Sequence, residues 1–214
     1  MKYLLAGMMA IAITSVSGCA SFHKEQLPLV QEMPDASHFH NQPSVYVDFD
    51  FYRGEPNSSP ADVDEAEKDL KPLIENVINE SNLFSKVSFS EFNKNNMDYT
   101  LQLRIYNHGP LAAAAVGGFI TGFTFGVIPS AATDNFTVVL EVLDNNNEQK
   151  SLYKSENRDA ITTWVGIWFI PVMNHTPIKA ASASLENQIR QALKEAFESG
   201  TMEYSAFQQL LKSA

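Results

Sequence analysis

Residues 99–106 read Tyr-Thr-Leu-Gln-Leu-Arg-Ile-Tyr, and apolar and polar side chains alternate along this stretch without a break. A period of two places the two sets on opposite faces of a β-strand. The same alternation runs from Val45 to Tyr52, before a Gly- and Pro-containing turn at 54–60. The two stretches therefore predict half-buried strands of one sheet, each with an apolar face toward a core.

One helix is predicted directly after the first strand. Apolar residues recur at three- and four-residue spacing from Val63 to Ile78, which gives one continuous stripe. Ser59 and Pro60 suit a helix cap and a first helical position. Pro72 falls inside the stripe and predicts a kink or a restart of the helix nearby.

A second helix is predicted near the C-terminus, where Ile178 to Phe197 carry apolar residues on one helical face. Pro177 suits its first turn and Gly200 its end. Three further strands are predicted at 84–89, 136–143 and 152–154, with a hairpin turn at 144–147. This order predicts an α+β fold: a mostly antiparallel sheet packed with two main helices, plus a Gly-rich apolar insertion.

The N-terminus has the pattern of a signal peptide. Met1 and Lys2 precede an uncharged, mostly apolar run to Val16, which is short for a permanent transmembrane helix. The run ends in Val-Ser-Gly-Cys at 16–19, which resembles the lipobox of bacterial lipoproteins. The resemblance implies removal of residues 1–18 and attachment of lipid to Cys19, the only cysteine of the chain. The alternative is an ordinary signal peptide with an incidental cysteine.

The lipobox resemblance also implies a location. Two or three acyl chains on one residue, palmitate among them, anchor a protein stably without a transmembrane helix. No Asp follows Cys19, and in the enterobacterial sorting pattern this absence implies export to the outer membrane, facing the periplasm. Residues 19–43 contain three prolines and little periodicity, so they predict a lipidated cysteine followed by a tether. A single α+β domain is expected over 44–214.

Residues 44–106 resemble the small periplasmic domains at the start of the Tol translocation protein and in curli-type or cell-wall-synthase-activating lipoproteins. The likeness is architectural and rests on the strand from Val45 to Phe51, the helix after it, and the helix exit Asn-Leu-Phe-Ser-Lys-Val at 82–87. It implies an envelope domain of α+β architecture.

Two uncharged segments, 109–133 and 160–174, stand apart from the rest of the chain. The first spaces small residues four apart, as in glycine-mediated helix pairing, and the second holds both tryptophans. Core or edge strands, a membrane-spanning helix and an interfacial hairpin all fit the pattern. The residues expected to form an apolar contact surface are Gly118, Gly122, Phe123, Gly126, Trp164 and Trp168.

Composition and motifs argue against several classes of function. A net charge of −10 and the absence of basic blocks argue against nucleic-acid binding. Asp48 and Asp50 share a strand face, and a solvated face is the preferred interpretation over acid–base work. His38 and His40 form a His-x-His pair, but they lie in the tether with no third ligand nearby. No nucleophile elbow, phosphate loop or His-Glu-x-x-His motif occurs. No catalytic residue, metal or cofactor is therefore predicted.

The leading hypothesis is a non-enzymatic, lipid-anchored envelope protein that binds or scaffolds a protein partner at the periplasmic face of the outer membrane. The alternative is a periplasmic domain that binds a lipid-like ligand in an apolar pocket, lined by Phe119, Phe123, Trp164 and Trp168. The sequence leaves the partner, the ligand and the oligomeric state open.

Overall fold

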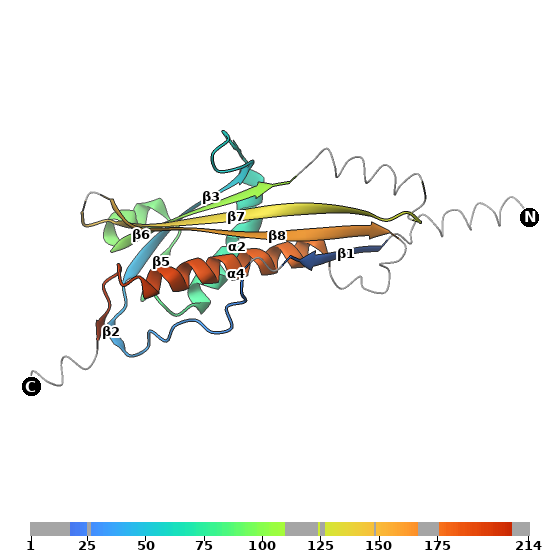
Figure 1. Cartoon of the computed structure of the whole chain (residues 1–214). Helices are drawn as coiled ribbons and strands as arrows, with labels where there is room; N and C mark the ends of the chain where they lie inside the picture. Colours follow the sequence, from blue (N-terminus) through green and yellow to red (C-terminus); the bar gives the residue numbers. More distant parts are fainter. Residues whose placement is uncertain are drawn as a thin grey trace, which may run out of the picture. The chain divides into compact units, whose positions relative to one another are not determined.

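The computed structural model describes residues 18–24, 27–109, 124, 127–147, 149–166 and 176–206. The elements in chain order are β1 (Gly18–His23), β2 (Phe39–Asn41), β3 (Ser44–Arg53), β4 (Ala61–Asp62), α2 (Asp64–Glu80), β5 (Lys86–Ser88), the 3-10 helix η1 (Glu91–Asn96), β6 (Tyr99–His108), β7 (Ser130–Asp144), β8 (Lys150–Gly166), α4 (Pro177–Glu198) and β9 (Ser205–Ala206). Figure 1 shows these elements along the chain.

The chain groups into two compact units. Unit 1 comprises Met1–Gln26, His108–Asn135 and Asp159–Ser184. Unit 2 comprises Leu27–Asn107, Phe136–Arg158 and Leu185–Ala214. Strands β7 and β8 and helix α4 each contribute several residues to both units, and β6 contributes its last residue, His108, to unit 1.

The large sheet contains seven strands in the order β1-β8-β7-β6-β3-β4, and β5 pairs with another part of β3. β1 is antiparallel to β8, β4 is antiparallel to β3, and the short turn between β7 and β8 makes those two strands antiparallel as well. β3 runs parallel to β6 and to β5. The predicted α+β fold, with a mostly antiparallel sheet and two main helices packed against it, is confirmed. The parallel pairing of β3 with β6 could not be predicted, because side chains alternate between the two faces in the same way in parallel and antiparallel strands.

The core of unit 2 lies where the sheet meets both helices. Seven side chains from β3, α2, β6, β7 and α4 meet there: Val47, Ile78, Leu101, Leu103, Leu140, Ile189 and Leu193. Each is at most 2% exposed. Burying one such side chain contributes roughly 1.5–3 kcal/mol, so this cluster determines how the sheet and helices pack.

Helix α2 begins later than predicted. Ala61 and Asp62, placed in the helix by the sequence analysis, pair with Arg53 and Tyr52 as β4, and Asp64 is the first helical residue. The strand pairing satisfies backbone groups that a first helical turn would leave without partners. The helix also continues through Pro72, where the sequence predicts an interruption. After the proline, the buried side chains of Ile74, Val77 and Ile78 pack the helix in place, and before it Glu67 accepts the Phe51 backbone N–H at 3.1 Å.

Strands β7 and β8 are longer than predicted and extend into the two uncharged segments. Residues 130–133 belong to β7 and residues 160–166 to β8. For these residues the strand interpretation of the uncharged segments is therefore correct. Among the described residues, none of the helices has the length and apolar character needed to cross a membrane.

The segment 19–43 was predicted as a tether, but in the structure much of it pairs with a strand or packs against the domain. Residues 19–23 form most of β1, which is bonded to β8. In unit 2 the Val30 backbone N–H donates to Asn187 Oδ1 at 2.8 Å, and Asn187 Nδ2 donates to the Pro28 carbonyl at 3.1 Å. Ala36 is 2% exposed. Proline spacing predicted an extended chain, but these side-chain contacts, distant in sequence, hold it against the domain.

Candidate functional site

Cys19 lies at the start of the edge strand β1 and is partly exposed. In the antiparallel register it stands opposite Val165, and Ala20 stands opposite Trp164. The bonded pairs continue to His23, opposite Ile161. Cys19, the predicted lipid attachment residue, is therefore itself paired within the sheet.

One face of the β1–β8 pair presents aromatic side chains. Residues opposite each other in an antiparallel pair share a face, so Ala20 and Trp164 share one, together with Phe22 and its partner Thr162. Phe22 is 42% exposed and Trp164 is 38% exposed, whereas Ala20 is fully buried. The two aromatic residues are diagonal neighbours, roughly 7–8 Å apart at the backbone.

The opposite face of β1 is polar and holds the strand in place. The hydroxyls of Ser21 and Thr163 are 2.8 Å apart, and Ser21 is 2% exposed. His23 Nδ1 lies 3.5 Å from Asp159 Oδ2. These side-chain contacts add to the backbone pairing of β1.

Asp159 is the centre of a buried polar cluster in unit 1. It is 4% exposed; its Oδ1 accepts the Ala160 backbone N–H at 2.8 Å, and its Oδ2 accepts the Ser184 hydroxyl at 2.6 Å. A serine nucleophile must bond to its histidine base and reach a substrate. Ser184 instead donates to the aspartate and is fully buried, so this Ser-His-Asp group stabilises structure. The sequence analysis missed the cluster, because its members lie far apart in the chain.

Exposed large apolar side chains concentrate in unit 1. It contains five of the seven among the described residues: Phe22, Val127, Ile128, Trp164 and Ile178. Isolated exposed apolar residues are ordinary on a protein surface, and only a contiguous apolar patch indicates a contact surface.

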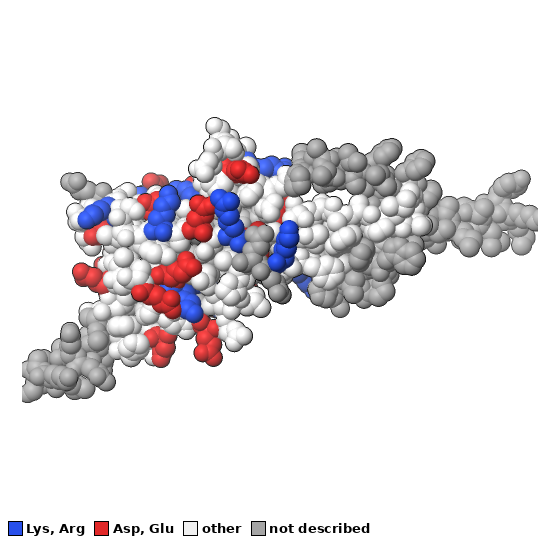
Figure 2. Space-filling view, in the orientation of Figure 1, with Lys and Arg blue, Asp and Glu red and all other residues white. Residues whose placement is uncertain are grey.

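Unit 1 is also poor in charge. Past residue 18 its charged residues are Lys24, Glu25, Asp134, Asp159 and Lys179. Most of the 25 acidic and 15 basic residues of the chain therefore belong to unit 2. In Figure 2 the charged side chains crowd one part of the visible surface and leave another part white.

The structure describes only part of the predicted contact surface. Trp164 is described and is partly exposed, and its place in a contact surface stays a prediction. Gly118, Gly122, Phe123, Gly126 and Trp168 lie outside the described residues, as do Phe119 and most of the segment 109–133. The sequence analysis missed Phe22, because a short stretch between Cys19 and Pro28 showed no usable periodicity.

The two predicted carboxylates, Asp48 and Asp50, bind Arg104 on the partly exposed face of β3 and β6. Arg104 donates to Asp48 Oδ2 at 3.1 Å and to Asp50 Oδ2 at 2.9 Å. Burial alone would lower the pKa of Arg104, but the hydrogen bond and negative charge of Asp48 and the charge of Asp50 raise it. Both carboxylates are thus held by a permanent cation, an arrangement that suits structure better than proton transfer.

A tyrosine pair extends this polar group. The rings of Tyr52 and Tyr106 stack with centroids 5.1 Å apart, and the Tyr52 hydroxyl donates to Asp50 Oδ2 at 3.1 Å. Burial, followed by the hydrogen bond and charge of Asp50, raises the pKa of Tyr52 to about 12.

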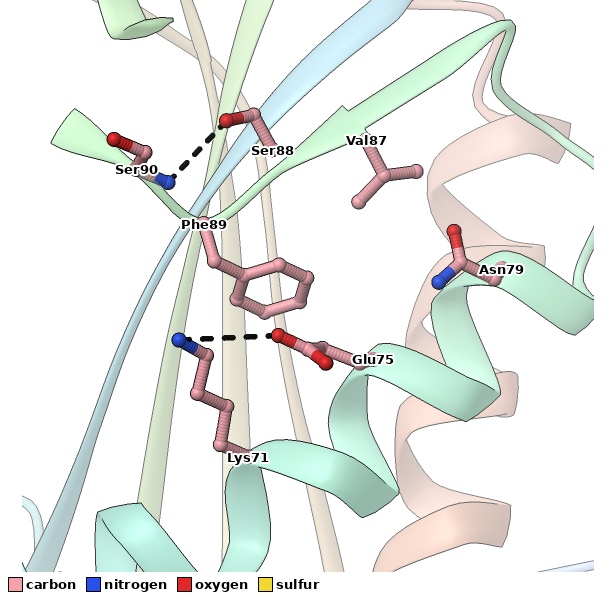
Figure 3. Close-up of a pocket in the computed structure, with 7 residues that line it drawn as sticks. All are labelled: Lys71, Glu75, Asn79, Val87, Ser88, Phe89 and Ser90. Atoms are coloured by element: carbon pink, nitrogen blue, oxygen red, sulfur yellow. Dashed lines mark hydrogen bonds and ion pairs between the residues drawn. The ribbon is translucent and has the colours of Figure 1, made fainter. Parts of the chain in front are cut away.

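A groove of about 420 Å³ lies in unit 2 between α2 and the residues of β5 and its continuation. Figure 3 shows Lys71, Glu75 and Asn79 on the helix side and Phe89 beside them. Lys71 Nζ is 3.8 Å from Glu75 Oε1 and 5.8 Å from the centre of the Phe89 ring. A second groove of about 500 Å³ is lined by residues 33–37, Gln42 and the end of α2. Both linings mix polar and apolar side chains, and neither includes Trp164, one of the residues of the apolar-pocket alternative.

The histidine pair carries no metal-site geometry in the described part of the chain. His38 packs against Phe39 with ring centroids 4.2 Å apart, and the side chain of His40 lies outside the described residues. Within the described ranges, no group of three or more His, Cys, Asp or Glu side chains could hold a metal ion.

Comparison with known proteins gives low similarity. No family model and no curated protein matches the chain. Among solved structures, the chain is similar to a PelC dodecamer from Paraburkholderia phytofirmans, with 10% identity, a TM-score of 0.36, and coverage of 83% of this chain and 97% of that chain. It is also similar to a DUF4136 family protein from Bacteroides thetaiotaomicron, with 12% identity, a TM-score of 0.28, and coverage of 86% and 96%. Values this low assign neither family nor function.

Proposed function

We propose that this chain is a lipid-anchored envelope protein that acts without catalysis, binding or scaffolding a protein partner at the periplasmic face of the outer membrane. Cys19 carries the anchor, and the exposed apolar residues of unit 1 form a contact surface. On the sequence pattern, Gly118, Gly122, Phe123, Gly126 and Trp168 extend this surface.

The observation that carries the proposal is the position of Cys19. The only thiol of the chain follows a signal-peptide pattern and begins a strand of the unit that holds most of the exposed apolar side chains. Exposing this apolar area to water is unfavourable for a protein free in solution. Contact with a membrane or a protein partner explains the exposed area better.

Acylation is tested in a Gram-negative host with a fatty-acid analogue. Cys19→Ser should abolish labelling and leave the chain as an unprocessed precursor with residues 1–18 attached. A matched control combines Cys19→Ser with Ser37→Cys, which restores one exposed thiol outside the lipobox and should remain unlabelled. Labelling of Cys19→Ser would refute the anchor.

Partner binding requires a second experiment. The intact acylated protein is crosslinked in the envelope, isolated and compared with a variant carrying Phe22→Ser and Trp164→Ser. A crosslinked protein that depends on the two aromatic residues would support a contact surface in unit 1. A crosslinking pattern that is identical in both proteins would contradict it.

A further inference from the structure

We propose that an extended segment of a protein partner adds to the outer edge of β5 as a further strand, lying in the groove between β5 and α2. This α2–β5 groove is lined by Lys71, Glu75, Asn79 and residues 87–90. The inference goes beyond the proposed function, because the groove belongs to unit 2 and does not depend on an acylated Cys19.

The first step is the direction in which the main-chain groups of β3 point. The Gly54 N–H, directly after β3, donates to the carbonyl of Asn107 in β6 at 2.9 Å, so even-numbered residues turn toward β6. Directions alternate along a strand, and the Phe51 N–H accordingly donates to Glu67 of α2 at 3.1 Å. The main-chain groups of Val45 therefore point away from β6 and toward β5.

The second step is the direction in which the main-chain groups of β5 point. In the parallel register, Val45 lies opposite Val87. A residue in a parallel pair bonds to the two neighbours of the residue opposite it, so Val45 bonds to Lys86 and Ser88. The N–H and C=O of Val87 then point to the outer edge. In the described part of the chain, β5 pairs with β3 alone and no side chain bonds to the Val87 main chain.

The third step is the wall that faces this edge. Lys71, Glu75 and Asn79 are spaced four apart, so they lie on one side of α2, and Figure 3 shows them across from Val87 and Phe89. At about 1.5 Å per helical residue, the span from 71 to 79 is about 12 Å, the length of about four strand residues. The groove, of about 420 Å³, therefore has room for a short extended segment.

The fourth step concerns the side chains that such a segment would meet. Val87 and Phe89 are two residues apart and both line the groove. Lys86 belongs to the opposite face of the strand and is not part of the lining, so the lysine that would discourage pairing at an edge does not fill the groove. Every second side chain of a docked strand would pack against Val87 and Phe89, which predicts a partner segment with apolar residues at alternate positions.

The fifth step is the charge of the lining. Lys71 Nζ lies 3.8 Å from Glu75 Oε1, and the other lining residues are uncharged. This neutral lining gives no advantage to a phosphate, a nucleic acid or a charged lipid headgroup. A polypeptide main chain carries the acceptor and the donor that match the N–H and C=O of Val87.

The sixth step is that β5 is already held in the extended form that pairing needs. The Ser85 N–H donates to the Pro43 carbonyl at 3.0 Å, and Asn93 Nδ2 donates to the Ser88 hydroxyl oxygen at 2.9 Å. Contacts on both sides of Val87 therefore fix the edge before a partner arrives, which lowers the entropy cost of binding.

The test uses the isotope-labelled mature chain, residues 19–214, with Cys19→Ser so that it is not acylated. The probe is the peptide acetyl-Thr-Val-Thr-Val-Thr-amide. The amide resonances of Val87 and Phe89 should shift during a titration. Hydrogen exchange of the Val87 amide should slow about tenfold at saturation, because its N–H becomes bonded.

Two controls separate main-chain pairing from other binding. A peptide N-methylated at both valines keeps its side chains but loses the donors that face β5, so it should cause no shift. Asn79→Phe fills the groove from an exposed position of α2 and should abolish the shifts with the original peptide. Asn76→Phe, exposed on the same helix but outside the lining, should leave them unchanged, and circular dichroism checks that both variants are folded.

The outcomes decide between the possible occupants. Shifts and slower exchange at Val87 that disappear with the N-methylated peptide and with Asn79→Phe support the added strand. A Val87 amide that does not respond to a large excess of peptide overturns it, as does binding that survives N-methylation. Exchange at Val87 that slows with protein concentration alone assigns the edge to a second copy of this chain and also overturns it. Because this protein carries no lipid, none of these results bears on the proposed anchor.

Discussion

Unit 1 and unit 2 share three long elements and yet differ in what they expose. Unit 2 buries a compact cluster of aliphatic side chains and holds most of the charged residues. Its exposed large apolar residues among those described are Leu29 and Phe92. Unit 1 contains few charges and the other five exposed apolar residues. Because both draw on β7, β8 and α4, the same element can contribute to a charge-rich unit along one part and to a charge-poor unit along another.

The largest effect should come from the core of unit 2. Leu103→Ala removes a 1% exposed side chain from the cluster between sheet and helices, and such changes cost about 2–5 kcal/mol of unfolding free energy. Phe22→Ser, on the exposed face of unit 1, should cost within about 1 kcal/mol. Urea unfolding of the unacylated domain, followed by circular dichroism, compares the two. Equal losses would make Phe22 a core residue and remove the contrast between the units.

The polar cluster of unit 1 should give an intermediate effect. Asp159→Ala leaves the Ser184 hydroxyl and the Ala160 N–H buried without their acceptor, which costs about 1–3 kcal/mol. Faster hydrogen exchange of the β1 amides is expected, because His23 loses its partner. Asp134→Ala, at an exposed position of β7, is the control and should leave exchange unchanged. If the β1 amides are equally protected in both variants, Asp159 does not help to hold the strand.

The smallest effect concerns alkaline pH and unit 2. The pKa of Tyr52 is raised from 10.0 to about 12, so the folded state disfavours the phenolate. The stability contributed by this group is fully present below pH 10 and is lost as the pH rises toward 12. Tyr52→Phe should therefore reduce the decrease in melting temperature between pH 10 and pH 12. Burial also raises the pKa of Tyr106, which stacks on Tyr52 but has no hydrogen bond to Asp50 among those described, so Tyr106→Phe should have a smaller effect. An equal effect of both changes would refute a specific role for the Asp50 hydrogen bond.

The site illustrates how far sequence reasoning reaches. Cys19 is predicted as the lipid attachment residue because a lipobox is a local pattern of consecutive residues, and that role stays a prediction. Trp164 was placed on the contact surface because it lies in an uncharged segment; it is 38% exposed, and its role in a contact surface stays a prediction. Phe22 and the cluster of His23, Asp159 and Ser184 could not be predicted, since their partners lie more than a hundred residues away or on another element.

The sequence by itself determined the strands, helices and turn that depend on short-range periodicity and turn chemistry. β3, β6, the turn at 144–147 and α4 follow this rule, because side-chain alternation and helical spacing are set by backbone geometry alone. Only the tertiary structure decided that β3 runs parallel to β6, that Ala61 and Asp62 pair as β4, and that the chain after Cys19 joins the sheet. Those outcomes depend on hydrogen bonds and packing between distant residues, which a periodic pattern does not encode.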